Sequence, residues 1–281
     1  MKIGNFKLKA IETIDFALDG GAMFGVIPKA LWSKSYNLGD EKNRIPLAAR
    51  LLLIETNKRK ILVDTGLGNK YPEKFGDIYG FDVSKSSAEY SLEQNGIKAN
   101  EITDVILTHL HFDHAGGATK NIYGEIIPTF PNAKYYVQKQ QFEWASKPTY
   151  KDKASFIEND YMPLYNEGIL ELIEGEGEFM EGIELVLHNG HTKSMQLVKI
   201  KDENNSVIYG ADFLPTKAHI LAPYFMGYDN FPLTVLEEKI KMLPQIYEEN
   251  TKIFFEHDAF TMMATIKPYK NGFIINESFE L

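Results

Sequence analysis

The spacing of apolar and polar positions predicts a strand-rich beginning to the chain. Residues 6–14 (FKLKAIETI) alternate with a period of two, as expected of a strand with one buried face. Two apolar runs, 48–56 (AARLLLIET) and 59–66 (RKILVDTG), meet at the basic turn NKRK, residues 57–60. Runs of this length joined by a short polar turn are typical of hairpins. We therefore expect an antiparallel hairpin over residues 48–66.

Helical spacing alternates with strand patterns along the rest of the chain. Residues 86–97 (SSAEYSLEQNGI) have helical spacing and end at an Asn-Gly stop, and a mixed helical insertion is expected over 148–168. Further strands are predicted at residues 101–109, 134–138, 183–191, 195–202, 205–212 and 251–258, and further helices at 139–146 and 232–249. Strands that cluster in each half, with helices between them, predict an α/β fold of the four-layer αββα sandwich type.

Composition and charge narrow the class of protein. The 281 residues are 44% hydrophobic and 25% charged, which is ordinary for a globular protein, and we expect one domain over residues 1–281. The net charge of −9 argues against nucleic acid or an anionic membrane as the main partner. No window approaches about 18 uninterrupted apolar residues, and the N-terminus lacks the apolar core of a signal peptide, so we expect a cytoplasmic protein. Because the chain has no cysteine, any metal must be held by histidine and carboxylate.

The stretch THLHFDHAGG, residues 108–117, holds three of the seven histidines. His109 and His111 are two positions apart, so in an extended segment their side chains point to the same side. Asp113 and His114 follow, and the glycines allow a tight turn into a helix. Two histidines beside an Asp-His pair can face two metal ions across a small gap.

Three later strand ends supply further polar side chains. His191, Asp212 and His257 each follow an apolar run, which places them at a sheet edge where loops build sites. Any single histidine is more often a core or surface residue, but burying the whole set without a metal would cost on the order of several kcal/mol. The sequence therefore predicts a metal site built from these residues and the histidine-rich stretch.

Three other polar residues allow a structural role as well as a role at the site. His188 belongs to a strand, and we interpret it as a hydrogen-bonded structural histidine. Asp64 ends a strand, where it could cap the turn or orient a metal-bound histidine, and we favour the second role. His219 lies in a segment expected to run over the site. For this residue, a role in lining the pocket and a purely structural role are equally well supported.

The order of these motifs along the whole chain resembles the metallo-β-lactamase-fold hydrolases. THLHFDHAGG matches the HxHxDH signature of that superfamily, NGHT (189–192) its third metal histidine, YGAD (209–212) its bridging aspartate and FEHD (255–258) its last histidine. Residues 19–34 (DGGAMFGVIPKALWSK) resemble the N-terminal signature of the YtnP-type quorum-quenching lactonases and of methyl parathion hydrolase. We interpret residues 19–34 as a cap and dimerisation stretch.

The resemblance implies two divalent metal ions, with a bridging hydroxide that attacks the substrate. The implied ligands are His109, His111 and His191 for one ion, and Asp113, His114 and His257 for the other, with Asp212 bridging. Zinc fits imidazole and carboxylate best, and iron, manganese, cobalt or nickel would also fit.

The resemblance also implies a lactonase that opens acyl-homoserine lactone rings, with Asp113 passing a proton to the leaving alkoxide and Asp212 in the catalytic centre. A promiscuous esterase or phosphotriesterase is the alternative, and a non-hydrolytic ligand-binding or di-iron redox protein is a third interpretation. Some acyl-homoserine lactonases carry a tyrosine three residues after the bridging aspartate, whereas this chain has Pro215. His219 and Tyr228 are therefore candidates to stabilise the oxyanion.

Apolar stretches point to the substrate and to a partner. Segments 23–32 and 222–231, rich in Met, Phe, Tyr and Trp, are expected to line a pocket for a small-molecule lactone or ester. Residues 22–32 are also too apolar for an exposed arm, and we predict that they form a homodimer contact rather than only covering their own sheet.

Overall fold

Two seven-stranded sheets carry the fold in the computed structural model, which describes all 281 residues. The chain divides into two compact units, each built from two separate stretches. Unit 1 comprises Met1–Ile14 and Ala49–Gly175, and unit 2 comprises Asp15–Ala48 and Glu176–Leu281. Strands β2 and β3 run from one unit into the other. One domain over the whole chain stays a prediction.

The sheet of unit 1 has the order β1-β2-β3-β4-β5-β8-β9. Its strands are β1 (Lys2–Ile3), β2 (Phe6–Asp19), β3 (Arg44–Glu55), β4 (Lys60–Val63), β5 (Asp104–Ile106), β8 (Lys134–Gln138) and β9 (Leu170–Ile173). Strands β3 and β4 form the predicted antiparallel hairpin, and β4, β5, β8 and β9 run parallel. Since parallel strands end at the same edge, the residues that follow β4 and β5 meet there.

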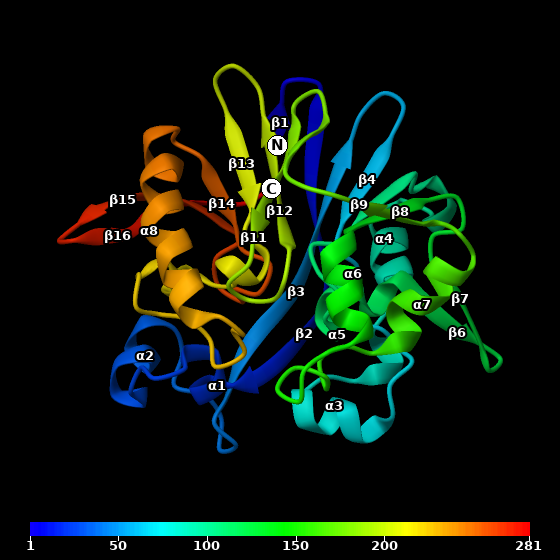
Figure 1. Ribbon diagram of the computed structural model, residues 1–281, viewed down its shortest axis with the longest axis horizontal. Coiled ribbons are helices and arrows are strands. Elements are labelled where there is room, and N and C mark those ends of the chain that lie inside the picture. The colour runs from blue at the N-terminus through cyan, green and yellow to red at the C-terminus, as the bar shows by residue number, and fades with distance from the viewer. The chain divides into compact units, whose positions relative to one another are not determined.

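Helices and one small hairpin complete unit 1 (Figure 1). The helices are α3 (Glu73–Tyr79), α4 (Ala88–Gln94), α5 (Phe112–Ala115), α6 (Lys139–Ser146) and α7 (Glu158–Asn166), with 3-10 turns η1 (Val83–Lys85), η2 (Ala99–Glu101) and η3 (Gly116–Ala118). The hairpin pairs β6 (Thr119–Ile122) with β7 (Glu125–Pro128). Helix α4 begins where predicted, because the Ser87 side chain accepts a hydrogen bond from the backbone N–H of Tyr90.

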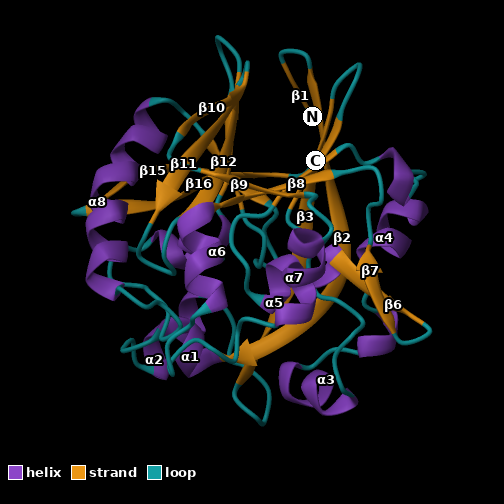
Figure 2. Ribbon diagram, turned by 45° about the vertical axis from the view of Figure 1, so that its right-hand side comes forward, coloured by secondary structure: helices purple, strands orange, loops and turns teal.

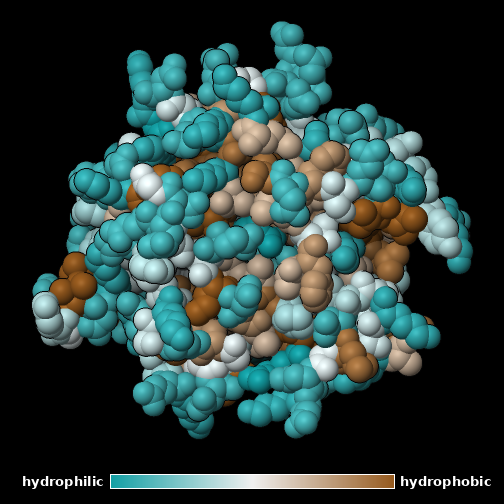
Figure 3. Space-filling view, turned by 180° about the vertical axis from the view of Figure 1, so that it is seen from behind, coloured by the Kyte–Doolittle hydropathy of each residue, from teal (hydrophilic) through white to brown (hydrophobic).

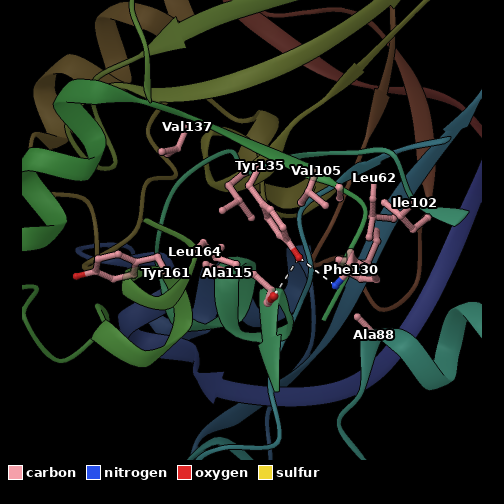
Figure 4. Packing of buried hydrophobic residues seen from close by; sticks show 14 of the residues in the cluster. Leu62, Ala88, Ile102, Val105, Ala115, Phe130, Tyr135, Val137, Tyr161 and Leu164 are labelled. Atoms are coloured by element: carbon pink, nitrogen blue, oxygen red, sulfur yellow. Dashed lines mark hydrogen bonds between the residues drawn. The ribbon is translucent and has the colours of Figure 1, made fainter. Parts of the chain in front are cut away.

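The core of unit 1 lies where α4, α6 and α7 pack against the strands (Figure 4). Leu62, Val105 and Tyr135 come from neighbouring strands and are fully buried. The Tyr135 hydroxyl accepts from the backbone N–H of Phe130 at 3.1 Å and donates to the carbonyl of Ala118 at 3.2 Å. Burial at this polar group is therefore matched by two hydrogen bonds, as a close-packed core requires.

The sheet of unit 2 has the order β10-β11-β12-β13-β14-β15-β16, antiparallel except for the parallel pair β13 and β14. Its strands are β10 (Gly177–Met180), β11 (Ile183–His188), β12 (Met195–Lys201), β13 (Ser206–Tyr209), β14 (Lys252–Phe254), β15 (Met263–Tyr269) and β16 (Gly272–Phe279). The helices are α1 (Gly20–Phe24), α2 (Lys29–Ser35) and α8 (Pro232–Glu248), with 3-10 turns η4 (Ala211–Phe213) and η5 (Lys217–Ile220). Figure 2 shows α8 as the long purple helix of this unit.

The predicted α/β class is confirmed, since each unit combines a β-sheet with helices. The pattern did not predict α3, the β6–β7 hairpin or the C-terminal hairpin of β15 and β16. None of the helices is long and apolar enough to cross a membrane. The face drawn in Figure 3 is mostly hydrophilic, with apolar residues in small separate groups.

Candidate metal centre

Unit 1 gathers its predicted ligands just after β5. The rings of His109 and His111 are buried, and Nε2 of the first lies 3.0 Å from Nδ1 of the second. His111 immediately precedes α5, and Asp113 and His114 lie within that helix. The Nε2 atom of His114 lies 3.9 Å from a carboxylate oxygen of Asp113. The motif therefore brings its four polar side chains together in one buried place.

Asp64 orients one of these histidines through a contact with its ring. It follows β4, with a φ of 57°, and its side chain accepts hydrogen bonds at 2.7 Å from both the N–H and the hydroxyl of Thr108. One of its oxygens lies 3.0 Å from Nδ1 of His114. The predicted contact between Asp64 and a motif histidine is confirmed. An acceptor at Nδ1 fixes the tautomer and leaves Nε2 as the ligand atom.

Unit 2 brings its predicted ligands together at one edge of its sheet. Strands β11, β13 and β14 point the same way, so their ends meet although the ligands are distant in sequence. Nε2 of His191 lies 3.0 Å from one carboxylate oxygen of Asp212, and Nε2 of His257 lies 3.3 Å from the other. All three side chains are buried. One carboxylate therefore faces two different histidines, which is the arrangement expected of a bridging ligand.

The other ring nitrogens of these two histidines are held by oxygen atoms. Nδ1 of His191 lies 2.8 Å from Asp229, and Nδ1 of His257 lies 2.9 Å from the carbonyl of Ala48. Asp229 also accepts from the N–H of Met226 at 2.7 Å. Burial lowers the pKa of His191, but Asp212 and Asp229 outweigh it and raise that pKa to about 9.

Sequence reasoning missed the role of Asp229. It precedes α8 in a loop, without the strand-end position that marked the other aspartates. Its contact with His191 is formed by chain segments that no local pattern connects.

The donor set of both units fits a divalent metal ion. Each of His114, His191 and His257 has Nδ1 against an oxygen, which leaves Nε2 for a metal. Neutral imidazole with carboxylate is a common ligand set for zinc and related ions. The residues present therefore suit the predicted chemistry, while the metal's identity stays open.

His188 and Tyr228 lie outside this ligand set. His188 lies buried at the end of β11, with Nδ1 2.5 Å from Glu238 and its ring 4.4 Å from that of Phe213, which favours the structural role. Tyr228 is half-buried in the turn before Asp229. Its catalytic role stays a prediction.

His219 is held at both ring nitrogens. Nδ1 lies 2.8 Å from the hydroxyl of Thr216, Nε2 lies 2.8 Å from the carbonyl of Met23, and the ring stacks on Phe24 at 4.9 Å. Burial, reinforced by the charge of Lys239, lowers the pKa of His219 to about 4. This geometry favours a structural role, in which His219 holds α1 in place. The role of His219 at the oxyanion stays a prediction.

Comparison with known proteins identifies the family. The model of the metallo-β-lactamase superfamily matches residues 46–250, most of the chain. The chain belongs to the metallo-β-lactamase superfamily. An N-acyl homoserine lactonase from Bacillus thuringiensis is 27% identical over 217 residues, which cover 73% of this chain and 79% of that protein.

Solved structures agree with this assignment. A probable metal-dependent hydrolase from Staphylococcus aureus is 29% identical, with a TM-score of 0.88 over 99% of this chain and 100% of that one. The dizinc quorum-quenching lactonase AidC, in complex with the product N-hexanoyl-L-homoserine, has a TM-score of 0.81 over 100% and 97% of the two chains. At 22% identity this second likeness concerns the fold alone. The family and its relatives make the chain a hydrolase.

Proposed function

We propose that this hydrolase is a dinuclear lactonase that opens acyl-homoserine lactone rings. The observation that carries the proposal is the pair of ligand sets, one in each unit, in a chain related to N-acyl homoserine lactonases. The proposed ligands are His109, His111 and His191 for one ion, Asp113, His114 and His257 for the other, and Asp212 for both. When bound, two divalent ions would acidify a shared water and polarise the substrate carbonyl. Zinc is the proposed metal, and iron, manganese, cobalt or nickel also fits these ligands.

The protein's own residues have separate tasks in this proposal. Asp64 and Asp229 hold His114 and His191 in the tautomer that presents Nε2. Asp113 passes a proton to the alkoxide that leaves when the ring opens. General acid help of this kind is typically worth about 10² to 10⁴-fold.

The side chains expected to line the pocket divide into two groups. Phe24 and Trp32 stack on each other at 5.2 Å and are buried within unit 2, so they support the wall rather than form its surface. Tyr228 is half-buried and Phe231 is exposed, and we propose that these two side chains contact the substrate. We propose that an apolar wall of this kind receives the acyl chain, because apolar pockets with few polar groups suit such a substrate.

A panel of substrates tests the lactonase proposal. We expect kcat/KM to be highest on homoserine lactones, above a chromogenic β-lactam, a glutathione thioester and an aryl phosphotriester. A thioester or β-lactam turned over faster than every lactone would contradict the substrate class.

Elemental analysis should return two ions per chain, and one ion or none under metal-replete conditions would contradict the dinuclear centre.

We also propose a homodimer through residues 19–34. Val26 is 78% exposed and Leu31 is 54% exposed, whereas Met23, Phe24 and Trp32 of the same stretch are buried. We take these two exposed apolar side chains as the proposed contact surface. Sedimentation should show a dimer at micromolar concentration, and the double substitution Val26→Asp and Leu31→Asp should yield a monomer. A wild-type monomer at that concentration would reject the proposal.

A further inference from the structure

A buried charged network lies behind the histidine motif in unit 1. Lys70 and Tyr71 lie in the loop after β4, and Asp160 lies in the first turn of α7. Nζ of Lys70 is 3.0 Å from one carboxylate oxygen of Asp160, and the Tyr71 hydroxyl is 2.8 Å from the other. The side chains of the ion pair are only 2% and 0% exposed. Such a pair pays a large desolvation penalty, so it is weak evidence for stability by itself.

The network makes its remaining hydrogen bonds to the backbone of the ligand segment. Nζ of Lys70 donates to the carbonyl of Gly116 and, at 2.8 Å, to that of Thr119. The Tyr71 hydroxyl lies 3.1 Å from the carbonyl of Phe112. Its single proton is therefore shared between that carbonyl and Asp160. The contacted carbonyls lie on both sides of Asp113 and His114.

Helix α5 needs this outside support because it has only four residues. A helix of one turn leaves its carbonyls without internal partners. A cation near the C-terminal end of such a helix is stabilising. Thr65 supplies a further anchor, since its N–H and hydroxyl donate to the carbonyl of His114 at 2.7 and 2.8 Å. Segment 65–71 thus holds α5 along its whole length.

Close backbone packing makes the support rigid. A Cβ atom added to Gly116 would lie 2.3 Å from the Tyr71 hydroxyl and 2.7 Å from the backbone nitrogen of Gly68. Contacts this short cannot occur, so the position requires glycine. Tyr71 and Gly68 therefore pack directly against the residue that follows α5.

We propose that Lys70, Tyr71 and Asp160 are positioning residues that set the carboxyl group of Asp113 for proton transfer to the leaving alkoxide. The proposal rests on the proposed function, in which Asp113 is the proton donor. In this proposal the buried ion pair serves to hold the backbone around α5 in one arrangement rather than to add stability. Tyr71 then links that pair to the residue that precedes Asp113.

The decisive variant is Tyr71→Phe, which removes one oxygen atom and keeps the ring. Its matched control is Tyr161→Phe, because Tyr161 is also buried and its hydroxyl donates to the carbonyl of Ala145 in α6 at 3.0 Å rather than to α5. Both variants are assayed on a homoserine lactone, whose alkoxide needs a proton, and on p-nitrophenyl acetate, whose phenolate does not.

For Tyr71→Phe we expect kcat on the lactone to fall about 10-fold, near the lower end of the effect of an outer hydrogen-bond partner. KM should change less than twofold, and the loss on p-nitrophenyl acetate should be smaller. The control should lose stability without changing the ratio of the two activities. Lys70→Arg should retain more lactone activity than Lys70→Met, since it keeps the cation. Equal losses on both substrates, or the same ratio in both tyrosine variants, would overturn the proposal.

Metal affinity gives a readout that does not depend on lactone turnover. Competition with a chromogenic zinc chelator should show Tyr71→Phe weakened about 10-fold at one of the two ions, with the other unchanged. Failure of the wild-type protein to hydrolyse any lactone would contradict the proposed function alone. Zinc affinities identical in Tyr71→Phe and Tyr161→Phe would overturn the positioning role.

Discussion

The two units of this protein assemble their predicted ligands in opposite ways. Unit 1 takes all of its ligands from one short stretch, residues 109–114, and supports that stretch from behind with the buried pair of Lys70 and Asp160. Unit 2 takes its ligands from three separate strand ends, which the sheet brings together around the carboxylate of Asp212. A continuous motif takes an outside anchor for its backbone, whereas the unit 2 ligands follow paired strands of one sheet, and that pairing brings them together.

Each unit also buries a lysine, and the two lysines differ in their partners. Lys70 lies beside the carboxylate of Asp160, which compensates its charge. Lys239 in α8 is fully buried and donates to the carbonyl of Tyr224. Burial lowers the pKa of Lys239 to about 7, although Asp229 opposes the shift. The comparison shows that the buried lysine of unit 1 is paired with a carboxylate, whereas that of unit 2 is bonded to a backbone carbonyl and has a lowered pKa.

The largest expected effect is loss of metal, and it distinguishes a ligand proposed for both ions from a ligand proposed for one. Asp212→Ala removes the carboxylate that faces two histidines, so we expect loss of metal from both positions and no measurable turnover. His114→Ala should lose one ion and keep the other. Elemental analysis after gel filtration measures both results. Retention of two ions per chain by Asp212→Ala would contradict the bridging role.

The next effect tests the chemistry of the unit 1 ligands. Asp113→Asn keeps a ligand oxygen but removes the acid, so turnover on a lactone should fall about 10² to 10⁴-fold. The loss should be smaller on p-nitrophenyl acetate, because its leaving group needs no proton. Steady-state kinetics at equal metal content gives the comparison. Identical losses on the two substrates would argue against proton donation by Asp113.

A third prediction compares the carboxylates that orient a histidine in each unit. Asp64→Asn acts on His114 in unit 1, and Asp229→Asn acts on His191 in unit 2. Each should weaken metal binding about 10 to 100-fold, because the histidine loses the partner that fixes its tautomer. Chelator competition measures the affinities, with the exposed Asp15→Asn as the control. If both variants bound metal as tightly as the control does, the orienting role would be wrong.

The smallest effect concerns the lysine of unit 2. The pKa of Lys239 is about 7 in the folded protein and near its ordinary 10.5 when unfolded, so the unfolded state binds more protons between these values. The free energy of unfolding should therefore rise with pH in that window, by about 1 kcal/mol between pH 7 and 8, while below pH 7 the penalty of burial is fully present. Lys239→Met should lack this rise, and Lys241→Met on the exposed side of α8 should keep it. Urea denaturation at both pH values measures the difference, and parallel curves for wild type and Lys239→Met would contradict the shift.

Much of this molecule was predictable from local patterns. The hairpin of β3 and β4, helix α4 and strands β11 to β14 follow from periodicity over a few residues, which is a property of the local sequence. A contact of Asp64 with one of the predicted metal-binding histidines was also predicted, from its position at a strand end, and the structure shows that this histidine is His114. The C-terminal hairpin of β15 and β16 was not predicted, although the structure places it in the sheet of unit 2.

The sequence by itself determined which side chains could bind a metal, since histidine and aspartate at strand ends are visible without any knowledge of packing. Apart from Asp64, the residues that hold these side chains in place were decided only by the tertiary structure. Asp229 reaches His191, and Lys70 reaches Asp160, across long stretches of chain. Such contacts leave no periodic trace in the sequence, because they depend on where two distant backbones meet and on the burial that makes a polar partner necessary there.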